Sequence, residues 1–584
     1  MIQVVRYSLG ILPAVGLLLL GLTLPSHAKS PIPSPAQMDR ELLEVTIPQL
    51  ERFYAQHRYT VTQVVQWHLA RIDRYNGIYR AIEAIMRSEA LASAAREDAE
   101  AAAGSAGGVA PRGAAARGAL WGVPIVIKAN TSIAGQVTTD GWEGYTIHEH
   151  ELIAPRDATI VAKLRAAGAI LIGHTNMPDF ANSDTNRSSS FGRTGNAYDV
   201  RFSPGGSSGG TVTAVTANMA VLGNGTDTGN SIRMPAATSA VIGVFPTRGL
   251  VSIAGIAPLD WMLDNTGPIA RTVADAAIAL SVMAGEDPLD PATARSTSKA
   301  QPGPYTQYLK LDALKGKRFG VPSFILKGIG IPFHGTPAAV AEGAAAKQAA
   351  DQSIPLDAKT LAAFLKAVDE LRAAGATVVF DGSILSEDFA RIASRISTYA
   401  YVREGTERFL NGFGPATYRS VSDYEKSVGA PLGAAVIGAE LANTRIGDTT
   451  VYQRNLETDP NAEANYFDPR RRAIDVYVGT LERLHLDGYV YPAIQMPPPD
   501  ETMPQGDHLS DGPHSATGWV NMLGVPAVVV VGGFYAGGLP FGLEFAARSW
   551  RDGDLLGYAF AWEQATHHRH PPALIDQGLL PNAP

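Results

Sequence analysis

The order of short apolar runs and helical patterns along the chain predicts an α/β fold. The run 119–128 has the character of a buried strand, the pattern over 158–167 fits a helix that ends at Gly168, and residues 169–173 form a second short strand. Helices and strands that alternate in this way are typical of α/β architecture. The apolar run 524–533 returns to core-strand character near the C-terminus, and we expect it to close the main sheet.

The remaining elements follow from composition and spacing. Residues 41–102 are rich in Ala, Glu, Arg and Leu with apolar residues at helical spacing, so we expect helices there. The Ala- and Gly-rich stretch 101–118 is expected to be a surface connection. Two glycine-rich loops are predicted further on, and a helix at about 210–218 and a strand at 220–223 lie between them.

Residues 286–480 differ from the rest of the chain in composition and in the regularity of their pattern. They contain proline and glycine clusters, scattered aromatic residues and Ala-rich helical patterns near 336–350 and 358–375. We expect a less regular region that covers a pocket as a lid.

The N-terminus has the pattern of a secretory signal peptide. Arg6 supplies a positive charge, residues 9–24 form an apolar segment, and Ser26-His27-Ala28 offers the small residues of a cleavage site. Cleavage after Ala28 would give a mature chain that begins at Lys29 and is periplasmic or secreted. An uncleaved membrane anchor is the alternative, although the apolar segment is short for a membrane-spanning helix.

Composition excludes several classes of function. The net charge of -8 argues against a nucleic-acid binder, which needs basic residues to neutralise phosphates. The absence of cysteine excludes a thiol nucleophile, disulfides and a lipid-attachment cysteine. The histidine-containing runs 148–151 and 567–570 do not have zinc-site spacing and are expected to be solvated, so we expect neither a metal nor an organic cofactor.

Three short sequence motifs, or words, contain the residues that could carry out chemistry. They are 205–210 (GGSSGG), 225–233 (GTDTGNSIR) and 122–130 (GVPIVIKAN), which places Lys128 at the end of an apolar run. Together they offer two hydroxyls, one amine and enough glycine to turn backbone N–H groups toward an oxyanion. These are the parts of a serine hydrolase that works without histidine.

Each word also has other interpretations. The first could be a flexible linker, although its flanks are not of low complexity, or the G-x-S-x-G elbow of an α/β-hydrolase, although no apolar strand precedes it. The second differs from a dinucleotide loop in its spacing, and Asp227 would repel a pyrophosphate. Lys128 alone fits a side chain that reaches from an apolar strand to solvent. With both serine words downstream, we interpret it as a catalytic base.

The combination resembles the amidase signature family of serine hydrolases. The resemblance runs from about residue 40 to 290 and again from about 485 to 570. The matching segments are 122–130, 173–177, 203–210, 225–236, 243–249 and 521–526 through 539–543. It implies an amidase-signature fold in which helices surround a central twisted mixed β-sheet, formed as a single domain over residues 29–584 with a variable insert at about 290–480.

The resemblance also implies a Ser–cisSer–Lys triad. Its matching words place the nucleophile at Ser231, the bridging serine after a cis peptide bond at Ser207 and the lysine at Lys128. The implied oxyanion hole consists of the backbone N–H groups of Thr228, Gly229, Asn230 and Ser231. The chemistry has a physical basis, because a serine hydroxyl needs a base and a lysine is a base only when burial keeps it neutral.

Two positions depart from the family pattern. Asn230 stands where the family usually has glycine, and we expect its side chain to narrow the acyl site. Phe245 replaces a lysine that is usual in the family word at 243–249. The aromatic residues Trp261, Tyr399, Tyr401 and Phe409 are expected to line the leaving-group side.

The sequence therefore predicts an exported amidase that hydrolyses linear carboxamide C–N bonds through an acyl-enzyme on Ser231. A carbamate, urethane or ester hydrolase is the nearest alternative. Further alternatives are an inactive binding protein and a tRNA-dependent amidotransferase subunit. The expected partner is a small amide substrate, without nucleic acid or stable membrane insertion after leader cleavage, and a homodimer is one allowed assembly.

Overall fold

The computed structural model describes Met1 and residues 34–106, 117–432, 445–446, 449–450, 454–502 and 512–574. The predicted signal peptide, apart from Met1, and most of the predicted connection 101–118 lie outside the described residues. Within the described ranges, no helix combines the length and the apolar character needed to cross a membrane.

The centre of the molecule is an 11-stranded sheet with the order β1-β3-β2-β6-β8-β7-β14-β15-β13-β9-β10. β2 runs parallel to β3 and β6, whereas β8, β7, β14 and β15 are each antiparallel to their neighbours, so the sheet is mixed. This confirms the predicted α/β class. The strands are β1 Ile82–Ile85, β2 Val123–Lys128, β3 Ala169–Thr175, β6 Leu222–Asp227, β7 Ile242–Phe245, β8 Asn265–Ala270, β9 Arg318–Gly320, β10 Thr377–Val379, β13 Gly488–Pro492, β14 Ala527–Phe534 and β15 Pro540–Ala546.

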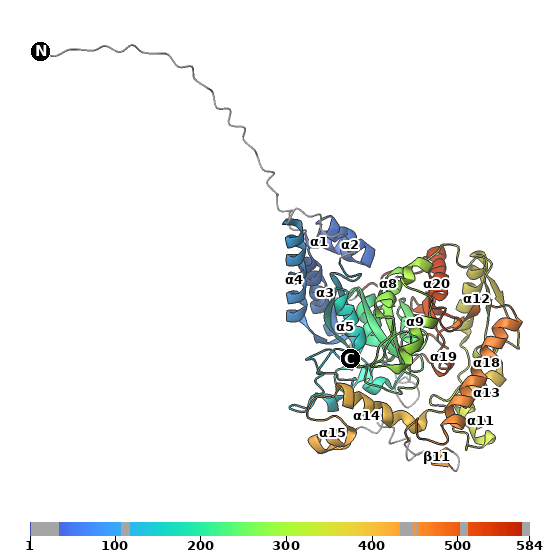
Figure 1. The fold of residues 1–584 in the computed structure, drawn as a ribbon. Coiled ribbons are helices and arrows are strands. Elements are labelled where there is room, and N and C mark those ends of the chain that lie inside the picture. Colours follow the sequence, from blue (N-terminus) through green and yellow to red (C-terminus); the bar gives the residue numbers. More distant parts are fainter. Residues whose placement is uncertain are drawn as a thin grey trace.

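Helices surround the sheet, with α1 to α4 gathered on one side of the molecule and α11, α12, α13 and α18 on the other (Figure 1). The α-helices are α1 Pro35–Leu42, α2 Ile47–Ala55, α3 Val61–Tyr79, α4 Arg87–Ala106, α5 Thr159–Ala166, α6 Gly209–Thr216, α7 Arg233–Thr238, α8 Val273–Met283, α9 Ser296–Lys299, α10 Ser323–Leu326, α11 Glu342–Asp351, α12 Ala358–Ala373, α13 Glu387–Ala393, α14 Val402–Phe413, α15 Val421–Val428, α18 Asp468–Arg483, α19 Trp519–Leu523 and α20 Asp552–Thr566. Two small hairpins, β4 Arg187–Ser188 with β5 Gly192–Arg193 and β11 Arg445–Ile446 with β12 Thr449–Thr450, lie outside the main sheet.

The predicted helical stretch 41–102 contains one strand, β1, which the sequence pattern did not reveal. α3 ends at Tyr79 and is capped by Arg80, whose φ of 48° is left-handed. Beyond it, the side-chain oxygen of Asn76 accepts from the N–H groups of Ala81 and Ile82, both at 2.9 Å. These bonds turn the chain out of the helix and into an edge strand that pairs with β3.

The other strand and helix predictions hold with shifted ends. β2 begins at Val123 rather than at residue 119, because residues 119–122 form a turn in which Gly122 has a φ of 72°. A Cβ at Gly122 would lie 2.8 Å from the Tyr54 ring, so glycine is required there. The predicted strand at 220–223 is β6, which extends to Asp227 and therefore contains the start of the second glycine word.

Residues 286–480, the middle region, contain more regular helices and strands than expected from the sequence. β9 and β10 lie within residues 286–480, and they extend the central sheet beyond β13. α11 and α12 confirm the two predicted Ala-rich helices. Only part of this region approaches the candidate site, chiefly the segment that contains Ile329, Ile331 and Phe333.

Candidate active site

Lys128 ends β2 and its side chain is fully buried. Its Nζ lies 2.7 Å from the hydroxyl of Ser207 and 3.1 Å from that of Ser208. It also donates to the hydroxyl of Thr226, at 2.8 Å. The structure therefore brings together the lysine and the first serine word, which lie 79 positions apart in the chain.

The environment of Lys128 favours a neutral amine. Burial penalises the ammonium form and lowers the pKa of Lys128 to about 7, against the opposing attraction of Asp140, Asp227 and Asp264. The carboxyl groups that would hold the proton on Lys128 are themselves affected by burial, which raises the pKa of Asp264 to about 7 and that of Asp140 well above its usual range. A lysine in this setting can act as a base near neutral pH.

Ser207 lies two residues before the start of α6, and the peptide bond between Gly206 and Ser207 is cis, as the resemblance implies. Gly206 has no room for a side chain. A Cβ there would lie 2.3 Å from the carbonyl oxygen of Thr185 and 2.4 Å from that of Ser183. This crowding explains why the first word needs glycine before its serine.

Ser231 lies between β6 and α7, and 5% of its surface is exposed. The backbone N–H of Ser208 donates to the carbonyl oxygen of Ser231 at 3.1 Å, so the two serine-bearing loops are joined directly. Ser231 also lines a cavity of about 380 Å³, whereas Lys128 and Ser207 are not among its described lining residues. Of the three predicted triad residues, Ser231 is the one that meets this space.

The predicted oxyanion hole, the backbone of residues 228–231, is held at both ends. Asp227 accepts from the N–H groups of Ile232 and Arg233, at 2.9 and 3.3 Å, while the hydroxyl of Thr228 donates to Asp264 at 2.6 Å. Within the described part of the chain, the N–H groups of residues 228–231 donate to no backbone group of another loop. The arrangement is compatible with N–H groups that stabilise an oxyanion.

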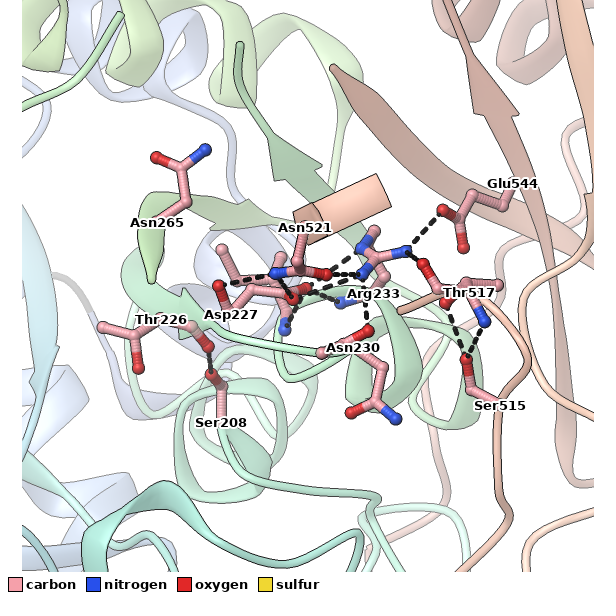
Figure 2. Close-up of polar contacts among 12 residues, drawn as sticks. Ser208, Thr226, Asp227, Asn230, Arg233, Asn265, Ser515, Thr517, Asn521 and Glu544 are labelled. Carbon is pink, nitrogen blue, oxygen red and sulfur yellow. Dashed lines mark hydrogen bonds and ion pairs between the residues drawn. The ribbon is translucent and has the colours of Figure 1, made fainter. Parts of the chain in front are cut away.

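A buried cluster of charged side chains contacts the loop of residues 228–231 (Figure 2). The guanidinium of Arg233 lies 3.1 Å from Asp227 and 2.9 Å from Glu544, and all three side chains are fully buried. Arg233 also donates to the carbonyl oxygen of Gly229 at 2.8 Å and to Asn521 at 2.6 Å. Because the cluster includes a backbone group two residues before Ser231, it fixes the path of the loop.

The structure explains what the two departures do. The side chain of Asn230 is directed away from the Arg233 cluster (Figure 2) and donates to Asp184 at 3.2 Å. Phe245 is fully buried, and the guanidinium of Arg233 lies 5.2 Å from its ring centroid. Although Phe245 is distant from the predicted triad in sequence, it therefore packs against the cluster that holds the loop of residues 228–231, where a lysine would place a second cation beside Arg233.

Polar and apolar residues both line the cavity that Ser231 meets. Its described lining residues are Ala181, Asn182, Ser183, Asp184, Gly229, Asn230, Ser231, Leu259, Gly328, Ile329, Gly330, Ile331, Phe333, Gln352, Ile354, Gln495, His514, Ser515, Ala516, Gly518 and Met522. The prediction that Trp261, Tyr399, Tyr401 and Phe409 line it was wrong. Trp261 and Phe409 line a separate cavity of about 540 Å³, and the indole N–H of Trp261 bonds to the backbone of Tyr401.

Sequence reasoning missed several residues of the site. Thr226, Asp227 and Arg233 stand inside the second glycine word, so their contacts with Lys128 and with the loop of residues 228–231 could have been suspected. Asn521 begins the C-terminal segment that resembles the family and Glu544 lies just beyond that segment, but nothing in the sequence linked either of them to Arg233. Asp140 and Asp264, two of the three acidic groups that act on Lys128, likewise belong to no word.

Comparison with known proteins agrees with this architecture. The sequence model of the family described as Amidase matches residues 63–332. The chain is 32% identical to a glutamyl-tRNA(Gln) amidotransferase subunit of Alkaliphilus metalliredigens, over 89% of this chain and 96% of that protein. It is 31% identical to the protein of the same name from Ralstonia pickettii, over 90% and 99% of the two chains.

Among solved structures, the native peptide amidase of Stenotrophomonas maltophilia superposes with a TM-score of 0.68 at 28% identity. The superposition covers 91% of this chain and 99% of that one. Sequence and fold thus point to the same family, whose named relatives act on carbon–nitrogen bonds. The chain belongs to the amidase signature family.

Proposed function

We propose that the chain hydrolyses linear carboxamides through an acyl-enzyme on Ser231. The observation that carries this proposal is the buried Lys128 amine, 2.7 Å from the hydroxyl of Ser207, in a loop bonded to that of Ser231. A neutral amine next to a serine hydroxyl is the base that a second serine needs to become a nucleophile.

In the proposed reaction, protons move only among the three side chains of Ser231, Ser207 and Lys128, the substrate and water. Ser231 Oγ attacks the amide carbon while its proton moves to Ser207, whose own proton moves to Lys128. The tetrahedral oxyanion accepts hydrogen bonds from the 228–231 backbone. The C–N bond then breaks as the proton returns through Ser207 to the leaving nitrogen. Water cleaves the resulting ester in the same way and regenerates Ser231. Each of these steps is completed by the three side chains, the loop backbone and water.

A second candidate is an amidotransferase subunit that acts on glutamyl-tRNA. Relatives that carry this name favour it, because two of them are 32% and 30% identical to the chain over 89% and 91% of its length. Against it stand the net charge of -8 and the cavity, whose described lining residues include Asp184 but no lysine or arginine. These features support a small uncharged or cationic amide better than an anionic substrate.

Ammonia release by the purified chain alone separates the two candidates. We expect turnover of simple primary amides without tRNA, ATP or a second protein, and no turnover by the Ser231→Ala variant. An amidotransferase subunit predicts the opposite pattern: little release from simple amides, and activity that appears only with partner subunits and glutamyl-tRNA. Matched esters and carbamates in the same assay measure the preference among acyl substrates.

We also propose that the protein is exported. The signal-peptide pattern of residues 1–28 supports this, and it agrees with a substrate met outside the cytoplasm. N-terminal sequencing of the protein from the periplasm or medium is expected to begin at Lys29. An intact Met1 in a soluble cytoplasmic fraction would contradict export and favour the amidotransferase candidate.

A further inference from the structure

One carboxylate lies in the wall of the cavity that Ser231 lines. Asp184 is half-buried there, and its Oδ1 accepts from the side-chain amide of Asn230 at 3.2 Å. Its Oδ2 lies 3.7 Å from Nδ1 of His514, which lines the same cavity. Asn230 directly precedes Ser231, so the carboxylate is attached to the nucleophile loop through one side-chain contact.

The position of Asp184 is fixed by its neighbours in the chain. The carbonyl oxygens of Ser183 and Thr185, on either side of it, enclose Gly206 of the first serine word. A Cβ at Gly512 would lie 2.4 Å from the carbonyl oxygen of Asp184, so a second segment packs closely on this backbone. Asp184 therefore stands in a rigid turn that contacts both serine-bearing loops.

The described lining of the cavity carries one carboxylate. Among its described lining residues, Asp184 is the only acidic side chain, and none is a lysine or an arginine. The other polar side chains that line the cavity are those of Asn182, Ser183, Asn230, Ser231, Gln352, Gln495, His514 and Ser515. Gln495 is 2% exposed, and neither its amide oxygen nor its amide nitrogen has a hydrogen-bond partner among the residues that the structure describes. A ligand with a cationic or hydrogen-bonding group would complement this wall.

We propose that Asp184 determines specificity for amides that carry a positively charged amine. This inference rests on the proposed function, because it names the substrate class of the same site. The ammonium of the substrate would take a place beside Asp184 while its carbonyl carbon meets Ser231. A half-exposed ion pair of this kind corresponds to roughly a five- to thirty-fold preference over a neutral substrate of the same shape.

The test uses pairs of amides that differ only in charge. 4-Aminobutanamide and pentanamide have equal length and end in an ammonium or a methyl group, and alaninamide and 2-methylpropanamide form the same comparison at shorter reach. We expect the charged member of at least one pair to have the higher kcat/KM, mainly through a lower KM. In Asp184→Asn, which keeps the size of the side chain, that ratio should fall at least five-fold.

Asp351→Asn is the matched control. It removes the same charge from an exposed residue of α11, just before the cavity residue Gln352, and should keep the ratio of the parent. His514→Gln tests whether the imidazole competes with the substrate for Asp184, and in that variant we expect the ratio to stay equal or rise. A parent that prefers the neutral member of both pairs, or a preference that persists in Asp184→Asn, would overturn the proposal.

Protection against covalent labelling separates this proposal from the proposed function. A fluorophosphonate probe that labels Ser231 reports occupancy of the cavity even if no amide is turned over. We expect 4-aminobutanamide to slow labelling at least five-fold more effectively than pentanamide in the parent but not in Asp184→Asn. Charge-dependent protection without hydrolysis would contradict the amidase proposal alone. Equal protection by both compounds would contradict the cation site alone.

Discussion

Replacing Lys128 by methionine is expected to stabilise the protein while removing its activity. Burial lowers the pKa of Lys128 from its ordinary 10.5 to about 7. The difference corresponds to roughly 5 kcal/mol by which the folded state disfavours the ammonium form. Methionine fills a similar volume without a charge. It loses the hydrogen bonds to Ser207, Ser208 and Thr226, worth about 1 kcal/mol each. The expected net gain at pH 7 is therefore about 2 kcal/mol.

The sign of the pH dependence follows from the same pKa. Between pH 7 and 10.5 the unfolded chain binds a proton at Lys128 that the folded chain has already lost, so the stability of the parent rises with pH in this window. Below pH 7 both states are protonated and the full penalty remains. The advantage of Lys128→Met should thus be largest at and below pH 7 and should disappear, or reverse, toward pH 10.

Chemical denaturation of parent and variant at pH 6, 7, 8.5 and 10 measures this difference. Lys347→Met is the control, because Lys347 is an exposed lysine on α11 and its loss should change stability by no more than about 0.5 kcal/mol. A Lys128→Met variant that is less stable than the parent at pH 7, with a deficit that does not depend on pH, would show that the amine is not destabilised by burial. The proposal of a neutral base would then lose its physical basis.

Three further predictions concern the same site. Lys128→Ala should lower amide turnover by about 10²–10⁴-fold and turnover of a matched ester by clearly less, because an amine must gain a proton to leave. In the parent, amide kcat/KM should fall about tenfold per pH unit below pH 7. Equal losses on both substrates, with an unchanged acid limb of the pH profile, would mean that Lys128 has a structural role only. Arg233→Met should lower the free energy of unfolding by about 3–5 kcal/mol, because Asp227 and Glu544 would stay buried without their cation. Arg471→Met, which removes an exposed arginine, should leave it almost unchanged. Equal effects of the two variants would refute a buried charged cluster. Gln495→Met should raise the free energy of unfolding by about 1–3 kcal/mol, because it removes a buried amide that has no hydrogen-bond partner within the described residues. Gln352→Met, at an exposed position of the same cavity, should not raise it. A destabilised Gln495→Met would show that the amide has hydrogen-bond partners in solution.

The parts of the site that lie in contiguous words could be predicted from the sequence. Lys128 closes an apolar strand, Ser207 stands in a glycine turn and Ser231 follows a strand. Together these patterns indicate a serine hydrolase, whereas the separate roles of the three residues came from the resemblance to the amidase signature family. The structure adds the contact of 2.7 Å that joins Lys128 to Ser207. For the same reason the α/β class and four of the eleven strands of the main sheet, β2, β3, β6 and β14, were predictable, since these buried strands are marked by their own apolar runs.

Contacts between distant segments could not be predicted. Asp184 and His514 meet in the cavity although 330 positions separate them, and neither belongs to a motif. The effect of Phe245 could not be foreseen, because its contact with Arg233 depends on how β7 packs against the loop before α7. Trp261 and Phe409 were assigned to the wrong cavity, because composition shows that aromatics are present but not which space they face.

The most direct test of the account is to find which serine forms the covalent intermediate. The parent, Ser231→Ala, Ser207→Ala and Ser208→Ala are each treated with a fluorophosphonate probe, and the labelled peptide is identified by mass spectrometry. We expect labelling at Ser231 in the parent, none in Ser231→Ala, strongly slowed labelling in Ser207→Ala and a smaller effect in Ser208→Ala, with all four proteins folded by circular dichroism. Labelling at Ser207 that persists in Ser231→Ala would contradict the account, because the nucleophile would then lie in the first serine word.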